Sequence, residues 1–248
     1  MGKDIDLGIN RTGTAISPAQ TAEMTQGAQQ HPVAPGDGVG IAEMRRSLIG
    51  ARVTVGSMPP PATARGVVQA AANLVKDVRP NVLLDRLGER LAFERTGARL
   101  YEALLAHVQE LPDPAIGLDP HAVLAIRDAE LRHFKLVRDA IVKLGGDPTV
   151  MTPAAVVAGV VSSGVLQAVT DPRTSRTQCL CAILTAELAD AEGWHLLSTL
   201  TRAAGHEDWA TRFDKAQAEE RTHVDRVRGW LEASTKADLL EGRVGVEA

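Results

Sequence analysis

Two short motifs combine a carboxylate with an imidazole at the same spacing. Glu130-Leu-Arg-His133 and Glu220-Arg-Thr-His223 each place a glutamate three residues before a histidine. Residues three apart share one face of a helix, so both side chains of each motif can point at a common centre. Carboxylate oxygens and imidazole nitrogens are ligands for divalent transition metals. We therefore interpret these four residues as candidate metal ligands.

Two single glutamates occupy matching positions in a longer internal repeat. Glu94, followed by Tyr101, aligns with Glu187, followed by Trp194, at an offset of 93 residues. The two Glu-x-x-His motifs are 90 residues apart. This repeat predicts two similar halves whose pseudo-twofold packing brings four ligand-bearing segments together. We expect Tyr101 and Trp194 to be either core fillers or groups that orient a ligand or relay an electron.

The same acids interrupt apolar stripes that have helical spacing. In steps of three and four residues, the first stripe runs through Leu87, Leu91, Glu94, Ala98 and Tyr101, and three later stripes follow the same pattern around the other acids. A mean step of 3.5 residues is typical of the buried seam of a helix bundle. The acids are therefore predicted to lie in the interior.

Burial of four ionised glutamates requires compensation. Each desolvated carboxylate costs several kcal/mol even after relaxation, and the four repel one another. Two divalent cations would carry a charge of +4 and balance the four acids, while two neutral imidazoles would complete the ligand set. Asp190 and Glu219 are candidates for residues that orient an imidazole. The predicted ligands of this two-metal site are Glu94, Glu130, His133, Glu187, Glu220 and His223.

Caps and breakers divide the region after Pro80 into four long helices. Asp119-Pro120 and Asp171-Pro172 each provide a capping acid followed by proline at the first helical position, and glycines at 145 and 205 end helices. Short connections join the first helix to the second and the third to the fourth, which predicts two antiparallel hairpins. The predicted helices cover residues 81–111, 120–145, 172–205 and 207–234.

Residues 148–170, between the second and third helices, carry no charge. Their number is close to that of a membrane span, but Pro153, Gly159 and Gly164 interrupt the stretch. We interpret it as a buried connector that crosses the bundle, and we expect no membrane association. Its stripe of small residues also leaves a subunit contact open.

The remaining segments show weaker patterns. Residues 1–63 are rich in Gly, Pro, Thr, Ser and Gln without a sustained period, which indicates an extended N-terminal arm. Val67, Ala71, Leu74 and Val78 predict a short helix over residues 64–80. Residues 81–234 form the predicted bundle domain, and residues 235–248 a C-terminal tail.

Composition excludes several classes of protein. The 248 residues are 44% hydrophobic, which suffices for a core, and the net charge of −4 gives no basic surface for nucleic acid. Aromatic residues make up only 3%, which favours helix over an all-β fold. Two cysteines, Cys179 and Cys181, exclude a disulfide scaffold. Because the first residues lack an apolar run of signal-peptide length, we expect a cytoplasmic protein.

The order of the ligand types (Glu, Glu-x-x-His, Glu, Glu-x-x-His) over residues 81–234 resembles the ferritin-like di-iron carboxylate superfamily. The ligand pattern is most similar to that of bacterioferritin and the rubrerythrin group, and residues 90–98 are similar to stretches in bacterial ferritin-like proteins of unassigned function. The resemblance implies an all-α, ferritin-like four-helix bundle with a helical crossover. It also implies two iron ions bound by the six residues, with Glu130 and Glu220 as bridges and Tyr101 beside the site.

The sequence departs from these relatives in ways that limit the expected activity. Leu131 stands where bacterioferritin has its haem-ligating methionine, so we expect no haem. A rubredoxin module is absent, and the long arm and apolar connector are foreign to cage-forming ferritins, which argues against iron storage in a shell.

The resemblance and the ligand types predict a di-iron oxidoreductase that reacts with O₂ or peroxide, as a ferroxidase or a peroxide scavenger. Manganese or a mixed pair fits the same ligands, and an external electron donor and a homo-oligomer are expected. One alternative is an oxidase or oxygenase of an organic substrate, with a pocket beside Gly97, Ala98 and Ala191. Another is a structural protein that uses the bundle as a scaffold and the arm for assembly.

Overall fold

The computed structural model describes residues 22, 26–27, 29–30, 38–50, 80–110 and 113–244. Within them the chain forms six α-helices and one 3-10 turn and no β-strand, so the predicted all-α class is confirmed. The elements are α2 (Gly38–Gly50), α4 (Pro80–Glu110), η1 (Pro114–Ile116), α5 (Pro120–Lys143), α6 (Pro153–Thr170), α7 (Arg176–Ala203) and α8 (Glu207–Val244).

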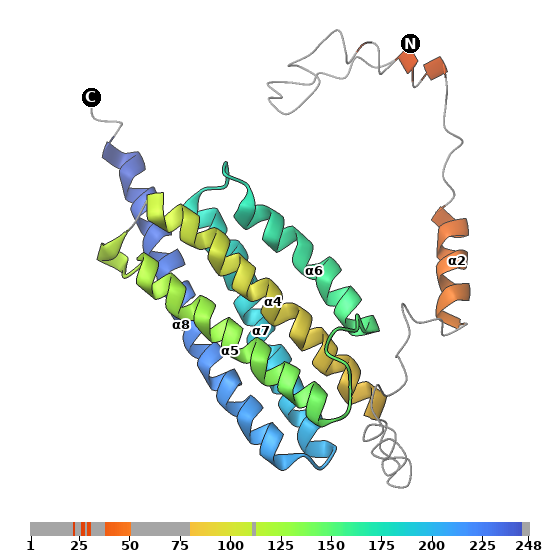
Figure 1. Cartoon of the computed structure of the whole chain (residues 1–248). Helices are drawn as coiled ribbons and strands as arrows, with labels where there is room; N and C mark the ends of the chain where they lie inside the picture. The colour runs from red at the N-terminus through yellow and green to blue at the C-terminus, as the bar shows by residue number, and fades with distance from the viewer. Residues whose placement is uncertain are drawn as a thin grey trace. The chain divides into compact units, whose positions relative to one another are not determined.

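Four long helices pack in two pairs. α4 packs against α5, and α7 packs against α8, each pair running in opposite directions (Figure 1). α4 also contacts α7, and α6 lies along α4 and α7. The two predicted antiparallel hairpins are thus present, with α6 as the connection between them.

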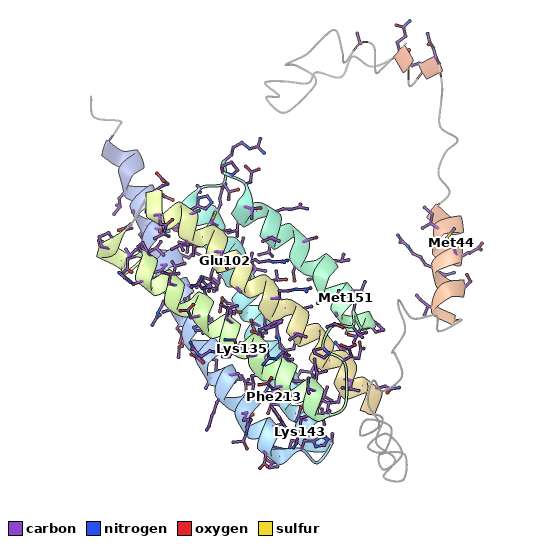
Figure 2. The ribbon with its side chains drawn as sticks, in the orientation of Figure 1. Met44, Glu102, Lys135, Lys143, Met151 and Phe213 are labelled. Carbon is purple, nitrogen blue, oxygen red and sulfur yellow. The ribbon has the colours of Figure 1, made fainter. Side chains whose placement is uncertain are left out.

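The core contains two apolar clusters with a polar layer between them along each helix. Phe213 is buried in one cluster, whereas Lys135 and Lys143 on α5 are exposed (Figure 2). The predicted ligands occupy sequence positions between the two clusters on all four helices. One cluster includes Leu104, Ile126, Leu180 and Val227, and the other includes Leu87, Val137, Leu197 and Phe213.

The predicted start of α5 is confirmed, whereas that of α7 is wrong. The Asp119 carboxylate accepts hydrogen bonds from the backbone amides of His121 and Ala122, at 2.8 and 3.0 Å, as an N-cap should. Asp171 instead bonds the amide of Arg173 in a turn that follows α6. α7 begins four residues later than predicted, at Arg176, because Ser175 and Gln178 form a capping box.

α8 is longer than predicted, since it continues from Ser234 to Val244. The hydroxyl of Thr177 on α7 donates a hydrogen bond of 2.6 Å to Asp238 and fixes this extension to the neighbouring helix. Residues 235–244 of the predicted tail are therefore helical, and residues 245–248 lie outside the described part.

The uncharged stretch forms a helix that is mostly exposed, so its predicted burial is wrong. Only 17% of α6 is buried; Ala155 and Ser162 face the core, while Val160 and Val161 are 71% and 70% exposed. The Asp85 carboxylate on α4 accepts a hydrogen bond of 2.9 Å from the amide of Ala154 and anchors its first turn. By length and composition alone, α6 is the one described helix that could cross a membrane.

The N-terminal predictions fall largely outside the described residues. Within the predicted extended arm, residues 38–50 form α2, which belongs to a separate unit comprising residues 1–53. Almost all of the predicted helix over residues 64–80 lies outside the described part, and Pro80 begins α4.

Candidate metal centre

All six predicted ligands are buried and face one another in the polar layer. α4 contributes Glu94, α5 contributes Glu130 and His133, and α7 contributes Glu187. α8 contributes Glu220 and His223. None of the six exceeds 5% exposure. The structure therefore brings together every residue that the spacing singled out.

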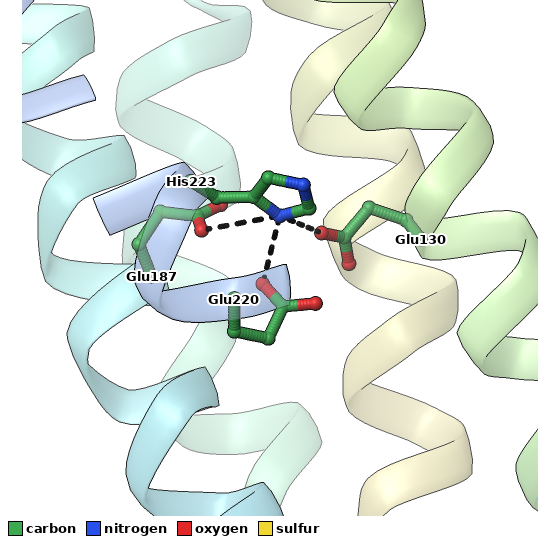
Figure 3. Close-up of side chains that lie close together, drawn as sticks. All are labelled: Glu130, Glu187, Glu220 and His223. Carbon is green, nitrogen blue, oxygen red and sulfur yellow. Dashed lines mark hydrogen bonds and ion pairs between the residues drawn. The ribbon is translucent and has the colours of Figure 1, made fainter. Parts of the chain in front are cut away.

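One group of ligand atoms surrounds His223. Its Nδ1 lies 2.9 Å from Glu220 Oε2 and 3.9 Å from both Glu130 Oε1 and Glu187 Oε2 (Figure 3). One potential ligand atom from each of these four residues lies within 4.8 Å of the others. Three helices thus supply donors to a space of the size of one metal site.

A second group surrounds His133. Its Nδ1 lies 2.6 Å from Glu220 Oε1 and 3.8 Å from Glu94 Oε2. The two oxygens of Glu220 therefore face the two histidines, one each. A third set of mutually close atoms comes from Glu94, Glu130, Asp190 and Glu220. Glu130 and Glu220 therefore lie close both to Glu187 and His223 on one side of the cluster and to Glu94 on the other.

The Nε2 atom of His133 faces a further carboxylate outside the six predicted ligands. Among the described residues, no such contact is found for His223. The Nε2 atom of His133 lies 3.1 Å from Glu219 Oε2, and Arg132 binds the other oxygen of Glu219 at 2.5 Å. This contact agrees with the interpretation of Glu219 as a residue that orients an imidazole. At the repeat-related position before Glu130 the chain has Ala129.

Arg90 is a buried cation of the cluster and was not predicted from the sequence. It is 4% exposed, and its Nε lies 3.0 Å from Glu94 Oε1. Its Nη1 lies 3.2 Å from Asp190 Oδ1 and donates a hydrogen bond of 3.1 Å to the Asp190 carbonyl oxygen. The i, i+4 spacing of Arg90 and Glu94 was the available signal. Asp190 thus contacts a guanidinium rather than an imidazole.

Tyr101 and Trp194 occupy related positions but make different contacts. The Tyr101 hydroxyl donates a hydrogen bond of 2.5 Å to Glu187 Oε1, so it is more than a core filler. Trp194 packs edge-on against the His133 ring, with centroids 5.4 Å apart. Both aromatic residues restrict the side chains of predicted ligands.

Burial governs the protonation of most acids in the cluster. Removal from water raises the pKa of Glu94, Glu130 and Glu187 well above the usual range of a carboxyl group, and repulsion by neighbouring acids adds to this effect. Burial also raises the pKa of Asp190 to about 7, although Arg90 acts in the opposite direction. Without a metal, several of these carboxyl groups therefore hold protons at neutral pH.

Glu220 behaves differently because it contacts both histidines. Burial acts to raise its pKa, but hydrogen bonds with His133 and His223 lower the pKa of Glu220 to about 2. Burial acts to lower the pKa of His133, but its hydrogen bond with Glu220 raises that pKa overall. Glu220 is thus the acid of this cluster that stays ionised without a metal.

Several ligand atoms lack hydrogen bonds although they are shielded from water. Among the described residues, Glu94 Oε2, both carboxylate oxygens of Glu130 and Glu187 Oε2 have no hydrogen-bond partner. Glu94 Oε1 contacts the Arg90 guanidinium, and Glu220 Oε1 contacts His133 Nδ1. Buried polar atoms are seldom unpaired without a reason, and an ion is one such reason. Carboxylate oxygens with two imidazoles form a donor set that suits iron or manganese. The residues present therefore fit a metal centre.

The space beside Gly97 is filled by a ligand rather than by a pocket. A Cβ atom at this position would overlap Glu130 Oε2, so the glycine allows the carboxylate to lie close to α4. Ala98 and Ala191 are also buried. At Gly97, the space in which a pocket was predicted is therefore occupied by the Glu130 carboxylate.

Comparison with protein-family models, curated proteins and solved structures finds no match to this chain. Its structure and sequence together establish an all-helical protein, in the described residues, with a buried Glu/His cluster that could hold a metal ion.

Proposed function

We propose that this protein is a di-iron oxidoreductase, built on a ferritin-like four-helix bundle, that reacts with O₂ or peroxide. The observation that carries the proposal is the convergence of six buried ligand side chains, several of whose carboxylate oxygens have no hydrogen-bond donor. α4, α5, α7 and α8 would form the bundle, and α6 would be its crossover. The ligand order along the chain supports the same assignment.

The contacts suggest how two ions would share the ligands. Glu94 and His133 would bind one ion, and Glu187 and His223 the other. Glu220 belongs to all three sets of mutually close ligand atoms and Glu130 to two of them, which supports both as bridging ligands.

Charge balance supports a pair of divalent ions. The four buried glutamates and Asp190 would carry −5 when ionised, and the buried Arg90 guanidinium contributes +1. The remaining −4 matches the charge of two divalent cations, with both imidazoles neutral. A single ion would leave an uncompensated charge in the core.

Two iron ions at this site would supply the pair of electrons that reduces peroxide to water, each ion passing from Fe(II) to Fe(III). The electrons come from the added Fe(II) itself or from an external donor. The protein's own groups position the reaction: Tyr101 restricts Glu187 through its hydrogen bond, and Glu219 restricts His133. Trp194 and the apolar clusters exclude water from the centre.

The test is oxygen or peroxide consumption by protein loaded anaerobically with two equivalents of Fe(II). We expect consumption together with ferric absorption in the near ultraviolet, and elemental analysis of protein purified without added metal should show iron. Glu130→Ala should abolish both signals, whereas Asp128→Ala, an exposed acid on the same helix, should leave them unchanged. Equal behaviour of the two variants would contradict the proposal.

A further inference from the structure

A cavity of about 170 Å³ lies between α4, α6 and α7, outside the cluster of metal ligands. Its walls are mainly apolar and include Phe93, Ala158, Val161 and Leu197. Val161 is exposed at the mouth, whereas Ala158 and Leu197 are buried. The cavity is therefore accessible from the surface along α6.

The polar wall residues are the ion pair of Arg86 and Glu89, Ser162, whose hydroxyl donates to the Ala158 carbonyl oxygen, and Arg90. Of these, the buried Arg90 also belongs to the metal centre. Its Nε faces Glu94 and its Nη1 faces Asp190, while Nη2 takes part in neither contact. The guanidinium stacks over the Phe93 ring at 4.3 Å. Gly193 is required opposite it, because a Cβ atom there would overlap Arg90 Nη1. The backbone is thus shaped around a guanidinium that separates the cavity from the ligands.

We propose that this cavity binds a small neutral organic molecule with one apolar ring and one carbonyl or hydroxyl oxygen, which accepts a hydrogen bond from Arg90 Nη2. The charge of Arg90 is already balanced by Glu94 and Asp190, and that of Arg86 by Glu89. An anion would therefore find no free counter-charge and would be repelled by these acids. A ligand without an oxygen would offer Nη2 no acceptor.

The size of the cavity limits the ligand to a single ring. A protein cavity of roughly 150 Å³ accommodates benzene, and this one is slightly larger and open at one side. Binding itself does not require a metal. The Arg90 guanidinium separates the bound organic molecule from the predicted metal ligands. A role of this molecule as a substrate rests on the proposed di-iron function.

The test uses 4-fluoroacetophenone as the probe, with fluorine NMR of the full chain in the presence of a chelator. 4-Fluorotoluene, which lacks the oxygen, and 4-fluorobenzoate, which carries a charge, should each bind at least tenfold more weakly. A matched pair of variants localises the site: Val161→Trp should weaken binding at least tenfold, whereas Val160→Trp, equally exposed but not part of the wall, should not. Ala158→Phe fills the cavity from its buried side and should also weaken binding.

Binding of the ketone that is unaffected by both Val161→Trp and Ala158→Phe would overturn the proposal, as would tighter binding of the benzoate or no binding of the ketone. Because these measurements use metal-free protein, their failure is distinct from a failure of iron binding. Iron-loaded protein that consumes O₂ faster with the ketone would identify the cavity as a substrate site.

Discussion

Glu220 connects the two sides of the cluster more directly than any other acid. Its two oxygens face His133 and His223, and it belongs to every set of mutually close ligand atoms. Glu187 belongs to one set only, together with His223. The two glutamates should therefore differ in how many ions depend on them.

Glu220→Gln should lower the metal content of the purified protein from two ions per chain to fewer than one, because both ions lose a shared ligand. Glu187→Gln should remove about one ion and leave the Glu94 side occupied. Metal analysis after dialysis against a fixed free Fe(II) concentration measures both, with Asp128→Asn as the control. Equal losses in the two variants would argue against Glu220 as a bridge.

Arg90 has a different role, since it neutralises acids without binding metal. Arg90→Met should lower the free energy of unfolding of the metal-free protein by about 3 kcal/mol at pH 8, because it leaves Asp190 buried and unpaired. Adding Asp190→Leu should restore most of that loss. Urea unfolding measures both variants, and a single variant as stable as the wild type would contradict this role.

The stability of the metal-free protein should fall as the pH rises from 5 to 8. The folded state raises the pKa of Glu94, Glu130 and Glu187, and that of Asp190 to about 7. It therefore binds more protons than the unfolded chain in this range, and unfolding becomes easier as they are lost. The lowered pKa of Glu220, about 2, acts only below this range.

The affinity for metal should increase as the pH rises from 5 to 8, because the ions displace protons from the buried carboxyl groups. Melting temperatures of chelated and metal-loaded protein between pH 5 and 8 test both statements. A melting temperature of the chelated protein that rises over this interval would be inconsistent with protonated buried acids.

At the scale of the elements, the ligand positions could be predicted because they depend on local periodicity. The seams of α4, α5, α7 and α8 fix which face each helix buries, and the acids interrupt those seams. The start of α7 could not be placed, because both Asp171-Pro172 and the pair Ser175 and Gln178 are plausible caps. In the structure, Asp171 forms a turn with Arg173, and Ser175 and Gln178 cap the helix. The sequence of α6 likewise does not reveal that one face is exposed.

Substitution of Gly97 tests how closely the Glu130 carboxylate of α5 must approach α4. Gly97→Ala should raise helix propensity yet reduce metal content, because the new methyl group displaces the Glu130 carboxylate. Gly229→Ala is the matched control: this glycine lies within α8 with open space around it, so the change should stabilise the protein by about 1 kcal/mol and keep both ions. Metal analysis and thermal unfolding of the two variants decide between these outcomes.

At the scale of the whole molecule, the all-helical class could be predicted from composition and periodicity. Contacts between residues far apart in the sequence could not. Arg90 was missed as a member of the cluster, and Asp190 was predicted to orient an imidazole rather than to pair with Arg90, because that pairing joins α4 to α7 across 100 residues of sequence. Cytoplasmic location, an external electron donor and a homo-oligomer stay predictions. Sedimentation of the full chain, compared with a chain beginning at residue 64, would show whether residues 1–63 contribute to assembly.

The central claim is that two ions occupy one buried site formed by all four long helices. Anomalous diffraction at the iron absorption edge, from crystals of protein loaded with Fe(II), tests it most directly. We predict two peaks roughly 3.5–4 Å apart, both between Glu130 and Glu220, with His133 next to one and His223 next to the other. No peak in the polar layer, or iron bound only at surface acids, would contradict the account.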